Sequence, residues 1–484
     1  MKVTKQSILS NLIWRFAERC GAQIVQLLVS IVLARILDPE AYGTIALVLV
    51  FANILQVFVD CGLGNALIQK KKADDLDFSS VFFFNIALCL VLYAILFFCA
   101  PLIAAFYNNP ALTDLTRVLG LTVVISGVKN VQQAYVSKTL QFKKFFFATL
   151  TGTIFSAVVG IGMAVYGLGV WALVAQKLTN LAIDTLALWV TVEWKPKRMF
   201  SWDRLKSLIS YGWKLLASSV LDTVYGNVRA LIIGKRYTES DLAYYNQGNQ
   251  FPNVIVTNIN SSIDSILLPV MSQEQDHKET VKKMTRRAIK TSTYIMAPLM
   301  MGLAFAAPNI VALILKPKWL PCVPYLRIFC ITYMFYPIHT ANLNAIKAMG
   351  RSDLFLKLEI IKKIVGMILI LITMWFGVMA MAYGLLAGSL INQIINTWPN
   401  RKLLDYKYTD QIKDILPGII LAVFMGVCIS FITALKLSAV ATLLIQIAAG
   451  IVIYLLGSVL TKNDSFIFLW DIIKKSRNSF LKKK

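Results

Sequence analysis

Residues 81–106 read VFFFNIALCLVLYAILFFCAPLIAAF, and this run contains no charged side chain. A helix needs about 20 residues to cross the roughly 30 Å hydrocarbon layer of a bilayer, and this run is long enough. Similar runs recur along the chain, in which 57% of the 484 residues are hydrophobic and 15% are charged. One globular core would not bury so much apolar surface, so the sequence predicts an all-α, polytopic membrane protein.

Apolar segments divide the chain into about fourteen predicted transmembrane helices. They cover residues 10–35, 42–68, 79–106, 112–136, 145–166, 170–192, 207–233, 242–270, 287–315, 322–347, 355–376, 379–399, 415–435 and 438–461. Charged residues interrupt the first segment, which also lacks a small-residue cleavage site, so we expect it to be retained rather than removed as a signal peptide. The seventh, eighth and tenth segments carry polar stripes, and a strict hydropathy count can miss them.

The basic residues, which give a formal net charge of +24, collect in alternate loops. These loops lie near residues 70–72, 138–144, 195–206, 278–290, 347–357 and 401–413. This alternation follows the positive-inside rule and predicts that both termini are cytoplasmic. It also argues against a nucleic-acid partner, because a nucleic-acid interface gathers its charge in one patch.

The two halves of the sequence resemble each other at an offset of about 200 residues. Residues 33–35 and 41–43 have counterparts in residues 233–235 and 243–245. Each half has six predicted spans, an even number, so the repeats run parallel about an axis along the membrane normal. The predicted domains are an N-terminal six-helix lobe (1–192), a basic cytoplasmic linker (193–206), a C-terminal six-helix lobe (207–400), two additional transmembrane helices (401–461) and a basic cytoplasmic tail (462–484). The tail is either an amphipathic helix on anionic lipid or disordered.

Polar and charged side chains recur at helical spacing within spans one, two, seven and eight. Such stripes need a shared aqueous space, because lipid does not solvate them and charges inside a membrane are costly. We therefore predict a water-filled central cavity. Its predicted substrate-binding residues are Arg15, Arg19, Lys129, Lys214, Arg229, Asn246, Gln250 and Asn253. The predicted ion-coupling residues are Asp60, Asp222 and Asp264. The alternative is that these groups only form salt bridges and hydrogen bonds that hold the bundle together.

The chemistry of these residues favours transport of an anion without a covalent step. Arg and Lys in a wet cavity suit phosphate or carboxylate groups, and Arg binds them bidentately. The chain has no Walker A motif, and His277, His339 and the seven cysteines show no metal-ligand spacing. We therefore expect no enzyme activity, no catalytic residues, no metal and no cofactor other than a coupling ion, H+ or Na+.

Five sequence strings carry a family resemblance. They are LARILDPEAYG (33–43), DCGLGNALIQ (60–69), APLIAAFY (100–107), GVWALVAQ (169–176) and KWLP (318–321). Together they resemble the polysaccharide transporter (Wzx-type flippase) family, within the multidrug/oligosaccharidyl-lipid/polysaccharide flippase superfamily. The strings look most like its colanic-acid and teichuronic-acid exporters. The resemblance runs from about residue 10 to residue 400.

The resemblance implies two six-helix lobes that work by alternating access in the bacterial inner membrane. Such proteins move undecaprenyl-diphosphate-linked oligosaccharide, the repeat unit of a surface polysaccharide or O-antigen, from the cytoplasmic to the outer leaflet. In the related lipid II flippases, cavity cations hold the diphosphate and two extra C-terminal helices form a groove for the lipid tail. The implied partners are the lipid-linked oligosaccharide, membrane lipids and, among proteins, a polysaccharide polymerase and glycosyltransferases.

Three other functions compete with this interpretation. A multidrug or cation antiporter of the same superfamily would favour an acidic cavity, whereas the stripes here are mixed to basic. A membrane glycan polymerase or glycosyltransferase would need a sizeable outer loop with catalytic side chains, and the predicted outer loops are short. A structural scaffold would not need charged stripes inside the membrane.

The alternation of basic loops generates a prediction about topology. In a variant with all seven native cysteines replaced, a cysteine at Asn109 or Gly169 should react with an impermeant reagent added outside intact cells. A cysteine at Lys71 or Lys282 should react only after the cells are opened. External labelling at Lys71 or Lys282 would reverse the predicted orientation.

Overall fold

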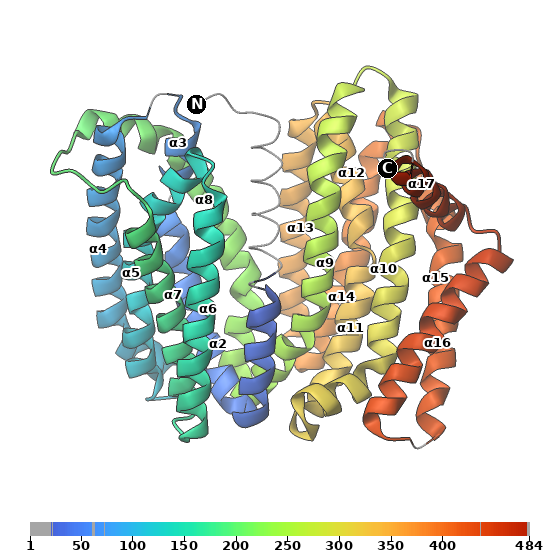
Figure 1. The fold of residues 1–484 in the computed structure, drawn as a ribbon, viewed down its shortest axis with the longest axis horizontal. Coiled ribbons are helices and arrows are strands. Elements are labelled where there is room, and N and C mark those ends of the chain that lie inside the picture. Colours follow the sequence, from blue (N-terminus) through green and yellow to red (C-terminus); the bar gives the residue numbers. More distant parts are fainter. Residues whose placement is uncertain (1–20, 22, 61–62, 72, 436, 482–484) are drawn as a thin grey trace. The chain divides into compact units, whose positions relative to one another are not determined.

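The computed structural model describes residues 21, 23–60, 63–71, 73–435 and 437–481, which fold into helices without any strand (Figure 1). The helices of the first half are Gln23–Ile36, α2 (Pro39–Asp60), α3 (Leu63–Gln69), α4 (Asp75–Tyr107), α5 (Leu112–Lys138), α6 (Phe142–Val165), α7 (Val170–Thr191) and α8 (Trp202–Arg236). Those of the second half are α9 (Glu239–Gln273), α10 (Lys278–Leu315), η1 (Pro317–Cys322), α11 (Val323–Met334), α12 (Tyr336–Ala348), α13 (Ser352–Thr373), α14 (Val378–Leu403), α15 (Tyr408–Phe431), η2 (Ile432–Leu435), α16 (Ala439–Leu460) and α17 (Asp464–Leu481).

The helices agree with the predicted membrane spans. Each predicted span from 42–68 onward coincides with one helix or with two consecutive helices. The first predicted span, 10–35, lies mostly outside the described residues, which include its last part as helix Gln23–Ile36. Eight of the described helices are long and apolar enough to cross a membrane, and the prediction of an all-α polytopic membrane protein is confirmed. Of the three spans that a strict count could miss, the seventh and tenth are not among these eight helices, whereas the eighth, α9, is among them. The helices of the fourth, sixth and eleventh predicted spans, α5, α7 and α13, are also not among the eight.

The chain forms two compact units, Met1–Ala243 and Tyr244–Lys484. Helix α8 packs against α2, α3 and α4 and therefore belongs to the first unit in this structure. In the second unit, α15 packs along α10, and α16 packs against both. The predicted lobe boundaries at residues 192 and 207 stay a prediction.

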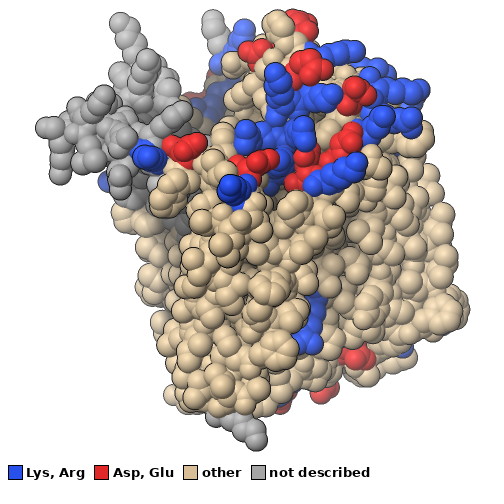
Figure 2. Space-filling model, turned by 90° about the vertical axis from the view of Figure 1, so that its right-hand side faces the viewer, with Lys and Arg blue, Asp and Glu red and all other residues tan. Residues whose placement is uncertain are grey.

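The second unit has an apolar side and a basic end. Helix α10 is 38 residues long, about 57 Å at 1.5 Å per residue, and therefore extends beyond a hydrocarbon layer of roughly 30 Å. Figure 2 shows one face of this unit, where Lys and Arg side chains gather at one end above a wide band of other residues. A membrane-spanning unit needs such a band, because lipid cannot solvate its surface charges.

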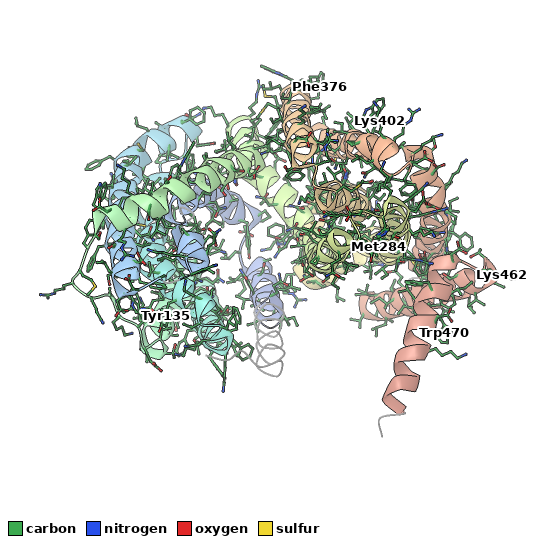
Figure 3. All side chains as sticks on the ribbon, turned by 90° about the horizontal axis from the view of Figure 1, so that it is seen from above. Tyr135, Met284, Phe376, Lys402, Lys462 and Trp470 are labelled. Atoms are coloured by element: carbon green, nitrogen blue, oxygen red, sulfur yellow. The ribbon has the colours of Figure 1, made fainter. Side chains whose placement is uncertain are left out.

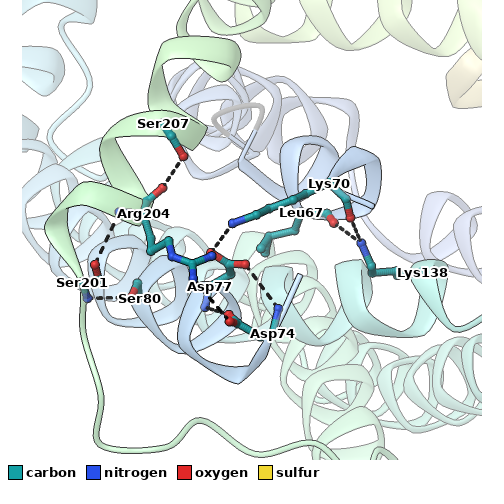
Figure 4. Close-up of polar contacts among 9 residues, drawn as sticks. All are labelled: Leu67, Lys70, Asp74, Asp77, Ser80, Lys138, Ser201, Arg204 and Ser207. Carbon is teal, nitrogen blue, oxygen red and sulfur yellow. Dashed lines mark hydrogen bonds and ion pairs between the residues drawn. The ribbon is translucent and has the colours of Figure 1, made fainter. Parts of the chain in front are cut away.

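A buried aspartate organises one end of the first unit (Figure 4). Asp77, in the first turn of α4, is fully buried and accepts a hydrogen bond from Lys70 Nζ at 2.6 Å. The guanidinium of Arg204, in α8, lies 3.7 Å from the same carboxylate and 3.8 Å from that of Asp74. The backbone N–H of Asp77 donates to the Asp74 side chain at 3.0 Å and lowers the pKa of Asp74. These contacts fix the start of α4 against α8.

Lys138 secures the end of the short helix α3. Its ammonium group donates to the backbone oxygen of Leu67 at 2.7 Å and also to that of Lys70. The last carbonyl groups of a helix have no partner within the helix, and a cation is favourable beside them. Lys138 therefore acts as a cap from a neighbouring helix, α5.

Two aspartates allow the buried ion pair to be tested. Asp77→Ala should lower the free energy of unfolding by about 1.5–3 kcal/mol, because it removes a buried, charge-assisted hydrogen bond and leaves Lys70 unpaired. Asp353→Ala is the matched control. Asp353 pairs with Arg351 at 2.8 Å with both side chains about half exposed, and such exposed pairs contribute little to stability. Thermal unfolding in detergent measures both variants, and equal loss would contradict the assignment.

Candidate functional site

A polar pocket of about 330 Å³ lies within the first unit, where α2, α5 and α7 meet. Most of the side chains that line it are polar or charged. They are Asn53, Gln56 and Asp60 from α2, Thr122, Ser126, Lys129, Asn130 and Gln133 from α5, and Lys177 and Asn180 from α7, with Leu49, Ala52 and Leu181. A polar space among membrane helices must hold water or a polar ligand, because its walls could not face lipid.

Helical spacing explains why these residues share one space. On α5, Ser126, Lys129 and Gln133 follow one another at intervals of three and four, which places them on one helix face. On α7, Lys177 and Asn180 have the same relation, and Asp184 continues the stripe by four residues. The predicted polar stripes lie on spans one, two, seven and eight, and Lys129 is the one residue of spans four and six among the predicted site residues. The same periodicity would have identified Lys177, Asn180 and Asp184.

Asp60, one of the predicted coupling residues, lies in this pocket at the end of α2. Its Oδ1 accepts hydrogen bonds from Gln56 Nε2 at 3.2 Å and from Asn130 Nδ2 at 3.1 Å. Both donors are neutral amides, so the charge of Asp60 is solvated without being neutralised. A carboxylate held in this way retains its ability to bind a proton or a cation.

Lys129, one of the predicted substrate-binding residues, pairs with a carboxylate of the same unit. Its Nζ lies 2.5 Å from Asp184 Oδ2, and the two side chains are 13% and 9% exposed. The second oxygen, Asp184 Oδ1, is buried and has no hydrogen-bond partner among the described residues. The pair thus neutralises the charge of Lys129 and leaves one acceptor oxygen unused.

Lys177 differs from Lys129 in its surroundings. It lines the pocket from α7, and within the part of the chain that the structure describes it forms no hydrogen bond or ion pair. An ammonium group enclosed by membrane helices is costly unless an anion or water accompanies it. Lys177 is therefore the pocket cation with charge available for a ligand.

The other predicted cations lie on or before α8. Arg15 and Arg19 are outside the described residues, as is the side chain of Lys214. Arg229 is partly buried on α8, and its Nε is buried without a hydrogen-bond partner among the described atoms. Asp222, on the same helix, is exposed. None of these α8 residues lines the pocket formed by α2, α5 and α7.

The remaining predicted residues lie on α9. Asn246 and Gln250 are partly buried, whereas Asn253 and Asp264 are exposed. Asn253 accepts a hydrogen bond from Thr257, one turn further along, at 3.4 Å. Because α9 is apolar enough to cross a membrane, this exposed polar face needs water or a polar ligand beside it.

The second unit contains an apolar groove of about 500 Å³. Helices α10, α15 and α16 form it, with Pro298, Gly302 and Gly450 among the lining residues. Its lining is hydrophobic apart from two tyrosines and Gln446. At one end, Tyr294 Oη lies 2.6 Å from Ser458 Oγ, and Tyr454 Oη donates to the backbone oxygen of Tyr294 at 2.8 Å.

The groove is open along its side. Leu299 on α10 and Ile447, Ile451 and Leu455 on α16 are each about half exposed. In a bilayer these side chains would contact hydrocarbon chains. An apolar groove with an open side therefore suits a long, flexible hydrocarbon more than a compact polar solute.

Comparisons with known proteins agree with this arrangement. A family model described as a polysaccharide biosynthesis protein matches residues 32–324, and one described as lipid II flippase MurJ matches residues 205–464. The chain is 26% identical to the lipopolysaccharide biosynthesis protein WzxC of Escherichia coli (strain K12), over 78% of this chain and 76% of that protein. It is 23% identical to the teichuronic acid biosynthesis protein TuaB of Bacillus subtilis (strain 168), over 94% of this chain and 95% of that protein. It is 22% identical to the succinoglycan biosynthesis transport protein ExoT of Rhizobium meliloti (strain 1021), over 81% of this chain and 77% of that protein.

Two solved structures share the fold. Lipid II flippase MurJ in an inward closed conformation superposes with a TM-score of 0.77 at 17% identity, over 95% of this chain and 100% of that one. An inward-facing multidrug resistance MATE family transporter superposes with a TM-score of 0.63 at 14% identity, over 81% of this chain and 98% of that one. At such low identity, these likenesses concern the fold alone. The family resemblance predicted from the sequence is confirmed by the family models and the relatives.

Proposed function

Because the chain belongs to the polysaccharide biosynthesis protein family, we propose that it is a flippase for a lipid-linked oligosaccharide. It moves an undecaprenyl-diphosphate-linked repeat unit from the cytoplasmic to the outer leaflet by alternating access. The observation that carries the proposal is a polar pocket among membrane helices that contains Lys177, a lysine with no hydrogen-bond or ion-pair partner among the described residues. A glycan offers hydroxyl groups and a diphosphate offers negative charge, and such a pocket has partners for both.

Different polar residues bind different parts of the substrate. Lys177 binds an anionic group through a charge-assisted hydrogen bond, and Asn53, Gln133 and Asn180 bind hydroxyl groups nearby. Asp184 Oδ1 accepts from a further hydroxyl group, because it has no other partner among the described residues. The predicted cations Arg15, Arg19, Lys214 and Arg229 bind the diphosphate, and the predicted α9 amides Asn246, Gln250 and Asn253 bind the sugar.

The polyprenyl tail stays in the hydrocarbon layer and lies along the groove of α10, α15 and α16. The groove is apolar and open at its side, so a tail enters it from lipid without crossing a polar region. The diphosphate and sugar then cross while the tail remains in apolar surroundings. This separation removes the cost of transferring a long hydrocarbon through a wet cavity.

The proposal also includes a location and partners. The protein lies in the bacterial inner membrane with both termini in the cytoplasm, as the basic loops predict. Glycosyltransferases must supply its substrate on the cytoplasmic side, and a polymerase must consume its product outside. No covalent step is assigned to the flippase itself.

Carboxylates in the membrane provide the coupling in this scheme. Asp60 carries H+ or Na+, because its carboxylate faces the pocket and its partners Gln56 and Asn130 are neutral. Asp222 and Asp264 are the other predicted carriers, and both are exposed, Asp222 on α8 and Asp264 on α9. Membrane potential acting on the cations is the alternative energy source, at about 2.3 kcal/mol per charge per 100 mV.

Lys177 provides the test of this function. Lys177→Gln should weaken substrate binding about ten- to a hundredfold, because a charge-assisted hydrogen bond contributes about 1.5–3 kcal/mol. In cells that depend on the variant, surface polymer should fall while lipid-linked intermediate accumulates in the inner leaflet. Surface polymer and lipid-linked intermediate are each extracted and quantified. Intermediate in the inner leaflet is recognised because it is protected from a glycan-modifying reagent added outside the cells.

Three further variants serve as comparisons in the same cells. Lys206→Gln, at an exposed position of α8, should leave transport unchanged. Lys129→Gln should lower thermal stability, because it leaves the buried Asp184 unpaired. Asp60→Asn should block transport in a folded protein if Asp60 carries the coupling ion. A stable, abundant and fully active Lys177→Gln variant would show that the pocket is not the substrate site.

The groove generates a separate prediction. Gly302 lies in the groove wall, and a Cβ there would meet only a methionine methyl group at 3.8 Å, so Gly302→Phe fills the groove without a backbone clash. Transport should fall about tenfold, equivalent to about 1.4 kcal/mol of lost binding. Gly162→Phe, in α6 with no atom within 4 Å of its Cβ, is the matched control and should retain activity. Equal activity of both variants would exclude the groove as the tail site.

A further inference from the structure

The last helix, α17 (Asp464–Leu481), belongs to neither the pocket nor the groove. It follows α16 after a turn at residues 461–463, where Lys462 has a φ of 49° and Asn463 Oδ1 accepts from the backbone N–H of Ser465 at 2.9 Å. Helix α16 is apolar enough to cross a membrane, so this turn lies where the chain leaves the hydrocarbon layer. Seen from above (Figure 3), α17 extends away from the other helices of its unit, with Trp470 on the extending part.

Two contacts join the first turns of α17 to α10. Lys290 Nζ lies 2.7 Å from Asp464 Oδ2, and this hydrogen bond lowers the pKa of Asp464. The guanidinium carbon of Arg287 lies 4.0 Å from the centre of the Phe468 ring. Asp464 and Phe468 are four residues apart and share one face of α17, so a single face contacts α10. The helix is therefore held at a defined place.

Other side chains of α17 are apolar and uncovered. Ile467 is 47% exposed and Trp470 is 59% exposed. The Trp470 ring stacks on Phe466, with 6.0 Å between ring centres and 22° between planes. Trp at the boundary of a membrane is favourable, because the headgroup region accommodates both its apolar ring and its N–H group.

The sequence from α17 to the end of the chain is basic. Residues 464–484 contain two acidic residues, Asp464 and Asp471, and six basic ones. The basic residues are Lys474, Lys475, Arg477, Lys482, Lys483 and Lys484. All six follow the apolar residues Ile467 and Trp470 in sequence. An apolar part followed by a cationic part is complementary to a membrane surface with anionic headgroups.

We propose that α17 is a membrane-surface helix that binds the anionic lipids of the leaflet on its own side. Ile467, Trp470 and Phe466 enter the interfacial region, and the basic residues from Lys474 onward bind headgroup phosphates. The contacts of Asp464 and Phe468 with α10 hold the first turns of this helix beside α10. The lipid-binding part of this inference is independent of the proposed transport function.

A fluorescent probe on α17 tests the inference in the full-length protein. In a variant with the native cysteines replaced, Ile467→Cys is labelled with an environment-sensitive dye. The protein is placed in nanodiscs of phosphatidylcholine alone or of phosphatidylcholine mixed equally with phosphatidylglycerol. In the anionic nanodiscs, emission should shift to the blue and lipid-attached quenchers should act more strongly. Added salt should reduce this difference, because salt screens the attraction.

Two triple variants identify the residues responsible. Replacing Lys474, Lys475 and Arg477 by Gln should abolish the difference between the two lipid compositions. Replacing Lys283, Lys402 and Lys413 by Gln removes the same charge from exposed positions of the same unit and should leave the difference intact. An identical emission in both compositions would overturn the inference. A lipid-dependent shift that persists after Lys474, Lys475 and Arg477 are replaced would also overturn it. The same holds if only a water-soluble quencher, and no lipid-attached one, quenches the dye in both compositions.

Discussion

A charged side chain within the hydrocarbon layer must have an opposite charge, a hydrogen-bond partner or water beside it. The first unit satisfies this constraint in three ways within one small region. Lys129 has a carboxylate partner in Asp184, and Asp60 has two neutral amide donors. Lys177 has neither among the described residues, so water or a polar ligand must accompany its charge.

The second unit meets the same constraint with neutral groups. Asn342 on α12 exchanges hydrogen bonds with Gln411 on α15 at 2.8 and 3.0 Å, and its Oδ1 also accepts from Asn400 on α14 at 2.7 Å. All three side chains are fully buried, and their hydrogen bonds join α12, α14 and α15. Asn400 Oδ1 is buried and has no hydrogen-bond partner among the described atoms, so the network is connected without being fully satisfied. A connected network of buried amides favours a particular arrangement of helices. The unit thus combines a buried polar junction with an open apolar groove.

The sequence predicted the helices better than the site. A membrane span is a local property of apolar length and flanking charge, so segments such as 242–270 could be located without knowledge of their neighbours. Asp60 and Lys129 were predicted because polar residues inside spans are conspicuous; both line the pocket, and their roles stay predictions. The pairing of Lys129 with Asp184 joins positions 55 residues apart and depends on how α5 packs against α7. The groove was expected only from resemblance, since its residues have the same composition as residues that face lipid.

The open side of that groove has a consequence for selectivity. A closed tunnel limits the length of the hydrocarbon chain that it can hold. The groove has Leu299, Ile451 and Leu455 exposed along its edge, so it does not limit the length of a bound chain. Isoprenoid chains of different lengths would contact the same stretch of wall and leave the excess among the lipids. Selectivity among lipid-linked substrates would then depend entirely on the groups at the polar end of the substrate. Exchanging one carrier lipid for a longer or shorter one should therefore be tolerated far better than altering the first sugar.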